Sequence, residues 1–138
     1  MPGIKIYPAD DWFSKCIREG NNNSCEMCGR SGIKMETHHY EGRRNFATRF
    51  EPLNCCCLCY SCHRKAHESP DRYKDFLVNK IGVMAYDVLK EKILDKALIA
   101  KQLRHEKKEL SKYFRDQYRE ILDKRAKGET RRIEVVGY

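Results

Sequence analysis

Apolar side chains recur at helical spacing in PADDWFSKCIREG, residues 8–20. Positions three and four apart lie on the same side of a helix. The shared face would carry Trp12, Phe13, Cys16 and Ile17. Asp10 or Asp11 can cap the start of this helix, and Gly20 can end it. The pattern therefore predicts an N-terminal amphipathic helix.

A strand-like alternation follows in IKMETHHY, residues 33–40, where Ile33, Met35 and Thr37 alternate with polar neighbours. The next segment, EGRRNFATRFEP, is expected to form a loop rich in Arg and Gly. LNCCCLC is a second candidate strand, and YSCHRKAH is long enough for two helical turns. The middle of the chain thus predicts two strands followed by a short helix.

The second half of the chain has a mainly helical pattern. Ser69 suits an N-cap and Pro70 the first helical position. The pattern then continues to about Lys127, with a break expected at Gly82 and a solvated interruption at residues 104–109. A loosely ordered tail is expected to follow. One apolar stripe at helical spacing comprises Leu110, Tyr113, Phe114, Tyr118, Ile121 and Leu122. Such a stripe is typical of a core contact or of a partner-helix face.

The charge of the chain is strongly basic. Its 138 residues include 28 Lys and Arg against 20 Asp and Glu, a formal net charge of +8. A polyanionic partner, nucleic acid first, would explain this excess, since basic side chains displace condensed counterions from phosphates. A solvated basic surface explains it equally well. No segment resembles a signal peptide or approaches the roughly 18 apolar residues of a membrane span. We therefore expect a cytoplasmic protein with no membrane partner.

Eight cysteines add candidate chemistry. Two Cys-x-x-Cys pairs, Cys25 with Cys28 and Cys59 with Cys62, have the spacing of a closed tetrahedral zinc site. A structural zinc would stabilise a segment too small for a large core. Disulfides are disfavoured because intracellular thiols stay reduced. The remaining cysteines, 16, 55, 56 and 57, are interpreted as small buried hydrophobes.

The histidines predict a second metal site of a different kind. His63 and His67 are four apart on the predicted short helix, so their imidazoles share a face. His38 and His39 end the first predicted strand and point in different directions. A third imidazole from the strand would complete a set with open positions for water and phosphate oxygens.

These residues carry a family resemblance. The series His38-His39, Asn54, His63 and His67 stands between the two Cys-x-x-Cys pairs. Over residues 25–67 it resembles the HNH nucleases of the ββα-metal (His-Me finger) class. Over about residues 8–125, ADDWFSKCIRE, THHYEGRRNFATRFEPLN and YKDFLVNKIGVMAYDVL are similar to phage NinG-type recombination nucleases. His38 and His63 stand where Gly and Asn are usual in that group, so the set is closer to the general HNH form.

The resemblance implies a role for each residue. His39 would be the general base, and Asn54 would brace the loop that orients it. His38, His63 and His67 would hold one divalent cation, for which Mg²⁺, Mn²⁺, Ni²⁺ and Zn²⁺ all remain open. Imidazole ligands suit the transition metals better than Mg²⁺.

Basic residues near this series are candidate DNA contacts. The connecting loop carries Arg43, Arg44 and Arg49, and the predicted short helix carries Arg64 and Lys65. They can contact backbone phosphates or stabilise transition-state charge. An ordinary basic loop is an equally good interpretation of the three arginines.

The expectation is an α+β protein. Its parts would be a helical lead-in (1–24), a zinc-bound HNH ββα-metal core (25–69), a basic helical extension (70–127) and a tail (128–138). The expected activity is metal-dependent hydrolysis of DNA phosphodiester bonds, on branched, recombination or packaging intermediates of a phage in its bacterial host. The alternative is a zinc-ribbon DNA-binding or scaffold protein without cleavage. Candidate partners are DNA, phage recombination or packaging proteins, and a second copy paired through the C-terminal helices.

Overall fold

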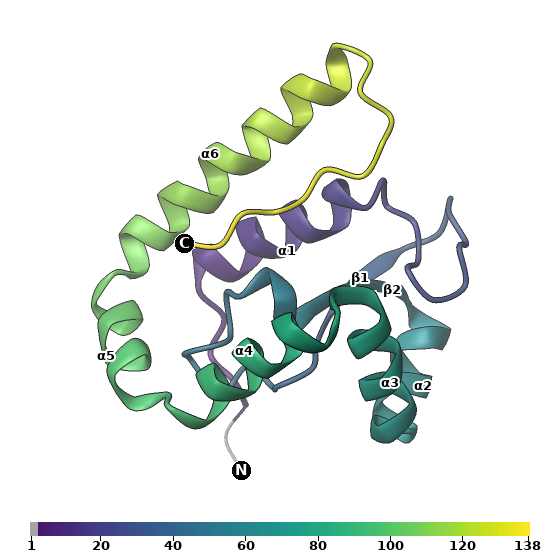
Figure 1. Ribbon diagram of the computed structural model, residues 1–138. Coiled ribbons are helices and arrows are strands. Elements are labelled where there is room, and N and C mark those ends of the chain that lie inside the picture. The colour runs from purple at the N-terminus through teal and green to yellow at the C-terminus, as the bar shows by residue number, and fades with distance from the viewer. Residues whose placement is uncertain (1–2) are drawn as a thin grey trace.

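The computed structural model describes residues 3–138, in which helices surround a small two-stranded sheet (Figure 1). In order, the elements are α1 (Pro8–Gly20), β1 (Met35–His39), a 3-10 turn (Pro52–Asn54), β2 (Cys55–Cys59), α2 (Tyr60–Glu68), α3 (Pro70–Ile81), α4 (Val83–Leu94), α5 (Ala97–His105) and α6 (Lys107–Ala126). The predicted N-terminal helix, both strands and the short helix are confirmed. Within the described residues, no helix is long and apolar enough to cross a membrane.

The two strands are antiparallel, and Met35 lies opposite Cys59 while His39 lies opposite Cys55. All five residues of β2 are buried, which agrees with the interpretation of Cys55, Cys56 and Cys57 as packing residues. Neighbouring side chains of a strand point to opposite faces. Thr37 accordingly faces α1, where its hydroxyl lies 2.8 Å from that of Ser14. His38 faces α2, and the strand therefore carries adjacent histidines to two different surroundings.

Helix α6 lies along α1, and the C-terminal tail returns beside them (Figure 1). Leu110, Phe114 and Ile121 are fully buried in this contact. The apolar stripe is thus part of the core of this chain, and these three side chains are not available for the predicted homodimer contact. The tail is also fixed, because Ile133 N–H donates to Gly20 O. A Cβ at Gly20 would lie only 2.6 Å from the Ile133 oxygen, so this close approach requires glycine.

The helical half is more divided than its sequence pattern predicts. The expected start holds, since α3 begins at Pro70 after Ser69, although the Ser69 side chain makes no capping bond. The break at Gly82 is confirmed, and its φ of 89° is one that glycine adopts readily. The break between His105 and Lys107 falls within the interruption predicted at residues 104–109, whereas the break after Leu94 was not predicted. No Gly or Pro marks the segment between Leu94 and Ala97, so that turn is set by packing instead.

Candidate functional site

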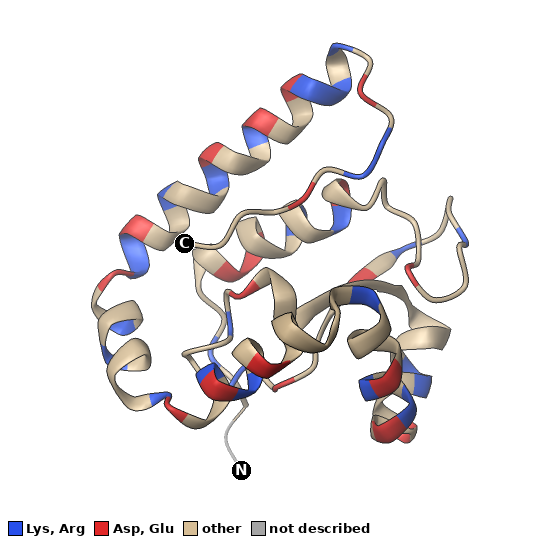
Figure 2. Cartoon of the chain, in the orientation of Figure 1, with Lys and Arg blue, Asp and Glu red and all other residues tan. Residues whose placement is uncertain are grey.

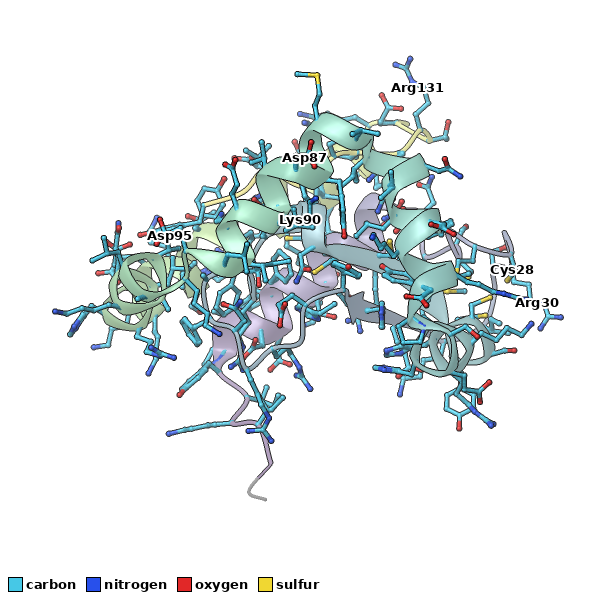
Figure 3. The ribbon with its side chains drawn as sticks, turned by 60° about the horizontal axis from the view of Figure 1, so that its bottom comes forward. Cys28, Arg30, Asp87, Lys90, Asp95 and Arg131 are labelled. Atoms are coloured by element: carbon cyan, nitrogen blue, oxygen red, sulfur yellow. The ribbon has the colours of Figure 1, made fainter. Side chains whose placement is uncertain are left out.

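The four paired cysteines come together at one end of the sheet. Ligand atoms of Cys25, Cys28, Cys59 and Cys62 all lie within 4.8 Å of one another. Cys25 and Cys28 sit in a turn before β1 that is closed by hydrogen bonds from Cys25 N to Arg30 O and from Gly29 N to Cys25 O, both 2.8 Å. Figure 3 shows Cys28 and Arg30 at an edge of the molecule. Cys59 ends β2, and Cys62 lies in the first turn of α2.

This cysteine cluster fits a structural zinc. Burial alone would raise the pKa of Cys25, but backbone hydrogen bonds from Cys28, Cys59 and Met27 lower that pKa to about 7. In the same cluster, burial and hydrogen bonds to the other three thiols raise the pKa of Cys62 to about 12, so the convergence of four sulfurs, more than their acidity, supports the zinc site. Four sulfurs leave no open position, so a zinc ion here would connect the turn before β1 to the start of α2.

Three histidines form a second cluster beside the sheet. Nitrogen atoms of His38, His63 and His67 lie within 4.8 Å of one another, and the ring centroids are 4.9 Å apart in every pair. The Nε2 atoms of His63 and His67 are 3.2 Å apart. His63 and His67 share one side of α2 because they are four residues apart, and His38 reaches them from β1.

The chemistry of this histidine cluster fits a divalent cation. His38 is buried, yet its Nδ1 has no hydrogen-bond partner. Burial, followed by the charges of His63 and His67, lowers the pKa of His38 to about 3. Burial likewise lowers the pKa of His63. These imidazoles are therefore neutral near neutral pH, the form that ligates metal.

Glu36 adds a carboxylate that the sequence pattern did not single out. It lies two residues before His38, on the same face of β1, and its Oε2 is 3.7 Å from His63 Nδ1. A carboxylate behind one ring nitrogen holds the proton there and leaves the other nitrogen for the metal. The two-residue period of a strand could have identified Glu36, because residues 36 and 38 lie on the same face of β1.

We expect Glu36→Gln to weaken divalent-ion binding at the histidine cluster by roughly 10- to 100-fold, the usual effect of removing such a partner. Competition with a chromophoric chelator measures the affinity. Glu68→Gln is the matched control. Glu68 is an exposed acid on α2, the helix that carries His63 and His67, and it pairs with Arg64. Equal losses in both variants would show that only total charge matters.

His39 has a different environment from the other three. Its Nε2 donates to the backbone oxygen of Arg49 at 2.9 Å, because a carbonyl can only accept. Burial lowers the pKa of His39 to about 4, although the bond to Arg49 opposes the shift. The ring is therefore neutral, and its protonated Nε2 leaves a lone pair on Nδ1. Such a nitrogen can accept a proton.

Asn54 is fully buried and fixes the loop that carries this carbonyl. Its Oδ1 accepts from Glu41 N at 2.8 Å, and its Nδ2 donates to Glu41 O and Thr48 O at 3.0 and 3.1 Å. One amide thus joins the two ends of the segment between β1 and the 3-10 turn. Thr48 directly precedes Arg49, so Asn54 positions the residue that orients His39.

Both kinds of histidine open onto one cleft of about 470 Å³. Its lining includes His38, His39, His63 and His67. A larger cavity of about 810 Å³ lies between the C-terminal tail and α3 to α5, but none of the four histidines reaches it. The smaller cleft therefore holds the candidate chemistry.

The predicted basic contacts separate into three groups. Arg43 lines the cleft. Arg44, Arg64 and Lys65 are exposed outside it. The prediction for Arg49 is wrong, because this side chain is buried with a guanidinium bound to both oxygens of Asp10 at 2.8 Å. The sequence pattern missed two further cleft cations, Arg18 and Lys34. Arg18 lies far from the histidines in sequence, whereas Lys34 lies only four residues before His38.

Asp10 is also not the N-cap of α1, which is Tyr7. It occupies the third helical position, where one oxygen accepts from Tyr7 N at 2.8 Å. We expect Asp10→Asn to lower the free energy of unfolding by about 3 kcal/mol, because it leaves the buried Arg49 charge uncompensated. Urea unfolding measures this. The exposed neighbour provides the control: Asp11→Asn should change stability by less than about 0.5 kcal/mol, and similar losses in both would contradict the buried pair.

Comparison with protein families matches residues 7–124 to the model described as bacteriophage lambda NinG protein. The chain belongs to the NinG family. This membership indicates a recombination-related role in a phage. The NinG match covers both the cysteine and the histidine clusters and ends within α6. No curated protein and no solved structure matched the chain.

Proposed function

We propose that this NinG-family chain is a metal-dependent endonuclease of the HNH type that hydrolyses phosphodiester bonds in DNA. The observation that carries the proposal is the convergence of His38, His63 and His67 within 4.8 Å, in a cleft that His39 also lines. The order β1, β2, α2 agrees with a ββα-metal core, in which a hairpin and a helix present the ligands. Three imidazoles leave coordination positions open, whereas the cysteine cluster leaves none.

The mechanism follows from the roles of the individual side chains. His39 Nδ1 accepts a proton from the water that attacks the scissile phosphorus. The Arg49 carbonyl keeps the proton of His39 on Nε2, and Asn54 keeps that carbonyl in place. Arg43 lies in the same cleft and offers positive charge to the phosphate. A divalent cation held by His38, His63 and His67 would supply charge stabilisation for the transition state and for the departing 3′ oxygen.

Membership in the NinG family suggests which forms of DNA to test as substrates. A recombination-related role in a phage makes branched DNA, or DNA intermediates of recombination or packaging, the form to test beside a linear duplex. An all-imidazole ligand set suits Mn²⁺, Ni²⁺ or Zn²⁺ better than Mg²⁺.

A DNA-binding or scaffold protein without cleavage is the alternative. The cysteine cluster and the net charge of +8 support both functions equally. A divalent ion would explain both the unpartnered buried His38 Nδ1 and the convergence of three imidazoles, and the coordination positions that it keeps open suit hydrolysis. That feature favours the nuclease.

The test is incubation of zinc-loaded protein with supercoiled plasmid and with a four-way junction. Each is run without added metal and with Mg²⁺, Mn²⁺, Ni²⁺ or excess Zn²⁺. We expect nicked or linear plasmid, or a cut junction, with at least one transition metal. Binding of both substrates without cleavage under any of these conditions would favour the alternative.

A further inference from the structure

Three cations around the histidine cleft have no acidic partner. The cleft is lined by Arg18 of α1, by Lys34 directly before β1, and by Arg43 in the loop after β1. No ion pair involves them within residues 3–138. We refer to Arg18, Lys34 and Arg43 as the cationic rim.

Several basic side chains elsewhere in the described residues are paired with acids. Lys112 and Lys127 of the α6 region pair with acids four residues away, at 2.8 and 2.9 Å. Figure 2 shows blue and red segments alternating along α6. In the larger cavity, Lys80 pairs with Glu26 at 2.8 Å and Lys92 with Glu51 at 3.3 Å. The net charge of +8 therefore does not identify the binding face. The rim is distinguished because its three cations line the histidine cleft, whereas other cations that make no ion pair within the described residues, such as Lys65, Lys101 and Arg119, lie outside that cleft.

Acids in the cleft do not cancel the rim. Asp10 is neutralised by Arg49, and Glu36 lies beside His63. Three cations thus face a single remaining carboxylate, so the cleft attracts anions even before any metal binds.

The placement of the rim fits a linear polyanion. Lys34 directly precedes β1, and Arg43 lies four residues beyond its last residue, His39. A five-residue strand spans roughly 13 Å at 3.3–3.4 Å per residue, and nucleotides of one DNA strand rise by about 3.4 Å each. A single backbone that enters this cleft beside β1 would pass Lys34, the histidines and Arg43, which all line it. A cleft of about 470 Å³ is on the scale of a small-molecule site, not of a whole duplex.

We infer that Arg18, Lys34 and Arg43 bind the phosphates of one nucleic-acid strand on either side of the histidine cluster. The inference rests on the proposed function and specifies how the substrate lies in that site. Phosphate contacts of this kind fix the register of the strand and carry no base sequence. The rim therefore selects the sugar–phosphate backbone and presents one phosphodiester to His39.

The test measures binding separately from cleavage. Arg18→Gln and Lys34→Gln are placed in a His39→Ala background, so that the DNA stays intact. Fluorescence anisotropy follows a labelled short duplex and the matching single strand over a range of salt concentrations. Each variant should reduce the slope of log affinity against log salt by about 1, because one phosphate contact is lost.

Controls of equal charge make the result specific. Lys112→Gln and Lys127→Gln remove the paired cations of the α6 region and should leave the slope unchanged. Arg18→Lys and Lys34→Arg should retain it. Circular dichroism and zinc content show that the variants fold, and Lys34→Gln alters an exposed side chain, so it tests the rim even if Arg18→Gln unfolds.

The outcomes separate the rim from the proposed function. Unchanged slopes in the Arg18 and Lys34 variants, equal losses in the controls, or no DNA binding by the parent would overturn the inference. Rim-dependent binding by a protein that cuts no substrate would support the rim and refute the nuclease. Cleavage by a protein whose DNA binding does not depend on the rim would support the nuclease and refute the rim.

Discussion

His39→Ala should reduce DNA cleavage by at least about 10²- to 10⁴-fold, the range attributed to a general base. In the structure His39 Nε2 is engaged by the Arg49 carbonyl, so Nδ1 is the nitrogen left to accept a proton from water. Among the described residues, the other imidazoles that line this cleft are those of His38, His63 and His67, which form the proposed metal site. Initial rates on supercoiled plasmid, compared at saturating metal, measure the effect.

The specificity of this effect is checked in the same preparation. Metal affinity at the histidine cluster and zinc content should remain near those of the unchanged protein, since His39 belongs to neither ligand set. His105→Ala is the matched control, because His105 is exposed on α5 outside the cleft, and it should cleave normally. Full activity in the His39 variant would show that another group accepts the proton.

Cys28→Ser should have the largest effect on folding. Cys28 is exposed and nearly the same size as serine, so the substitution removes a zinc ligand and little packing. Structural zinc contributes apparent binding energies of about 10–16 kcal/mol in zinc-finger peptides, and that energy is folding energy. We expect loss of bound zinc and of the near-ultraviolet circular dichroism of the segment from the cysteine turn to α2.

A buried cysteine outside the cluster distinguishes ligation from packing. Cys57→Ser changes a fully buried residue of β2 that is not among the four ligands. It should lower stability while leaving the zinc content at one ion per chain. A zinc-free Cys28 variant that remains folded and active would contradict the structural role of the cluster.

Local pattern was sufficient to predict the elements that build the site. The two Cys-x-x-Cys pairs, the i, i+4 spacing of His63 and His67, and the strand carrying His38 each have a short-range signature, and the structure brings their members together. Spacing also indicates which side chains share a face, because helices and strands have fixed periods. The contrast between His38 and His39 followed from the same rule.

Contacts between residues that are distant in sequence could not be predicted from local spacing. Arg49 and Asp10 are 39 residues apart, so nothing local distinguished a buried ion pair from a DNA contact. The stripe from Leu110 to Leu122 had the pattern of any buried helix face, and only the contact with α1 identifies its partner. Arg18 of α1 likewise reaches the cleft through tertiary packing. The sequence pattern thus predicted the candidate metal ligands, whereas tertiary packing determines which Arg and Lys side chains are buried in ion pairs and which line the cleft.

The central claim is that one divalent ion binds between His38, His63 and His67, separate from the cysteine cluster. Anomalous scattering from crystals grown with excess Zn²⁺ tests it most directly. The account predicts two peaks per chain, one among four sulfurs and one about 2.0–2.1 Å from the three histidine nitrogens. A single peak at the sulfurs, with the imidazoles turned away from one another, would contradict it.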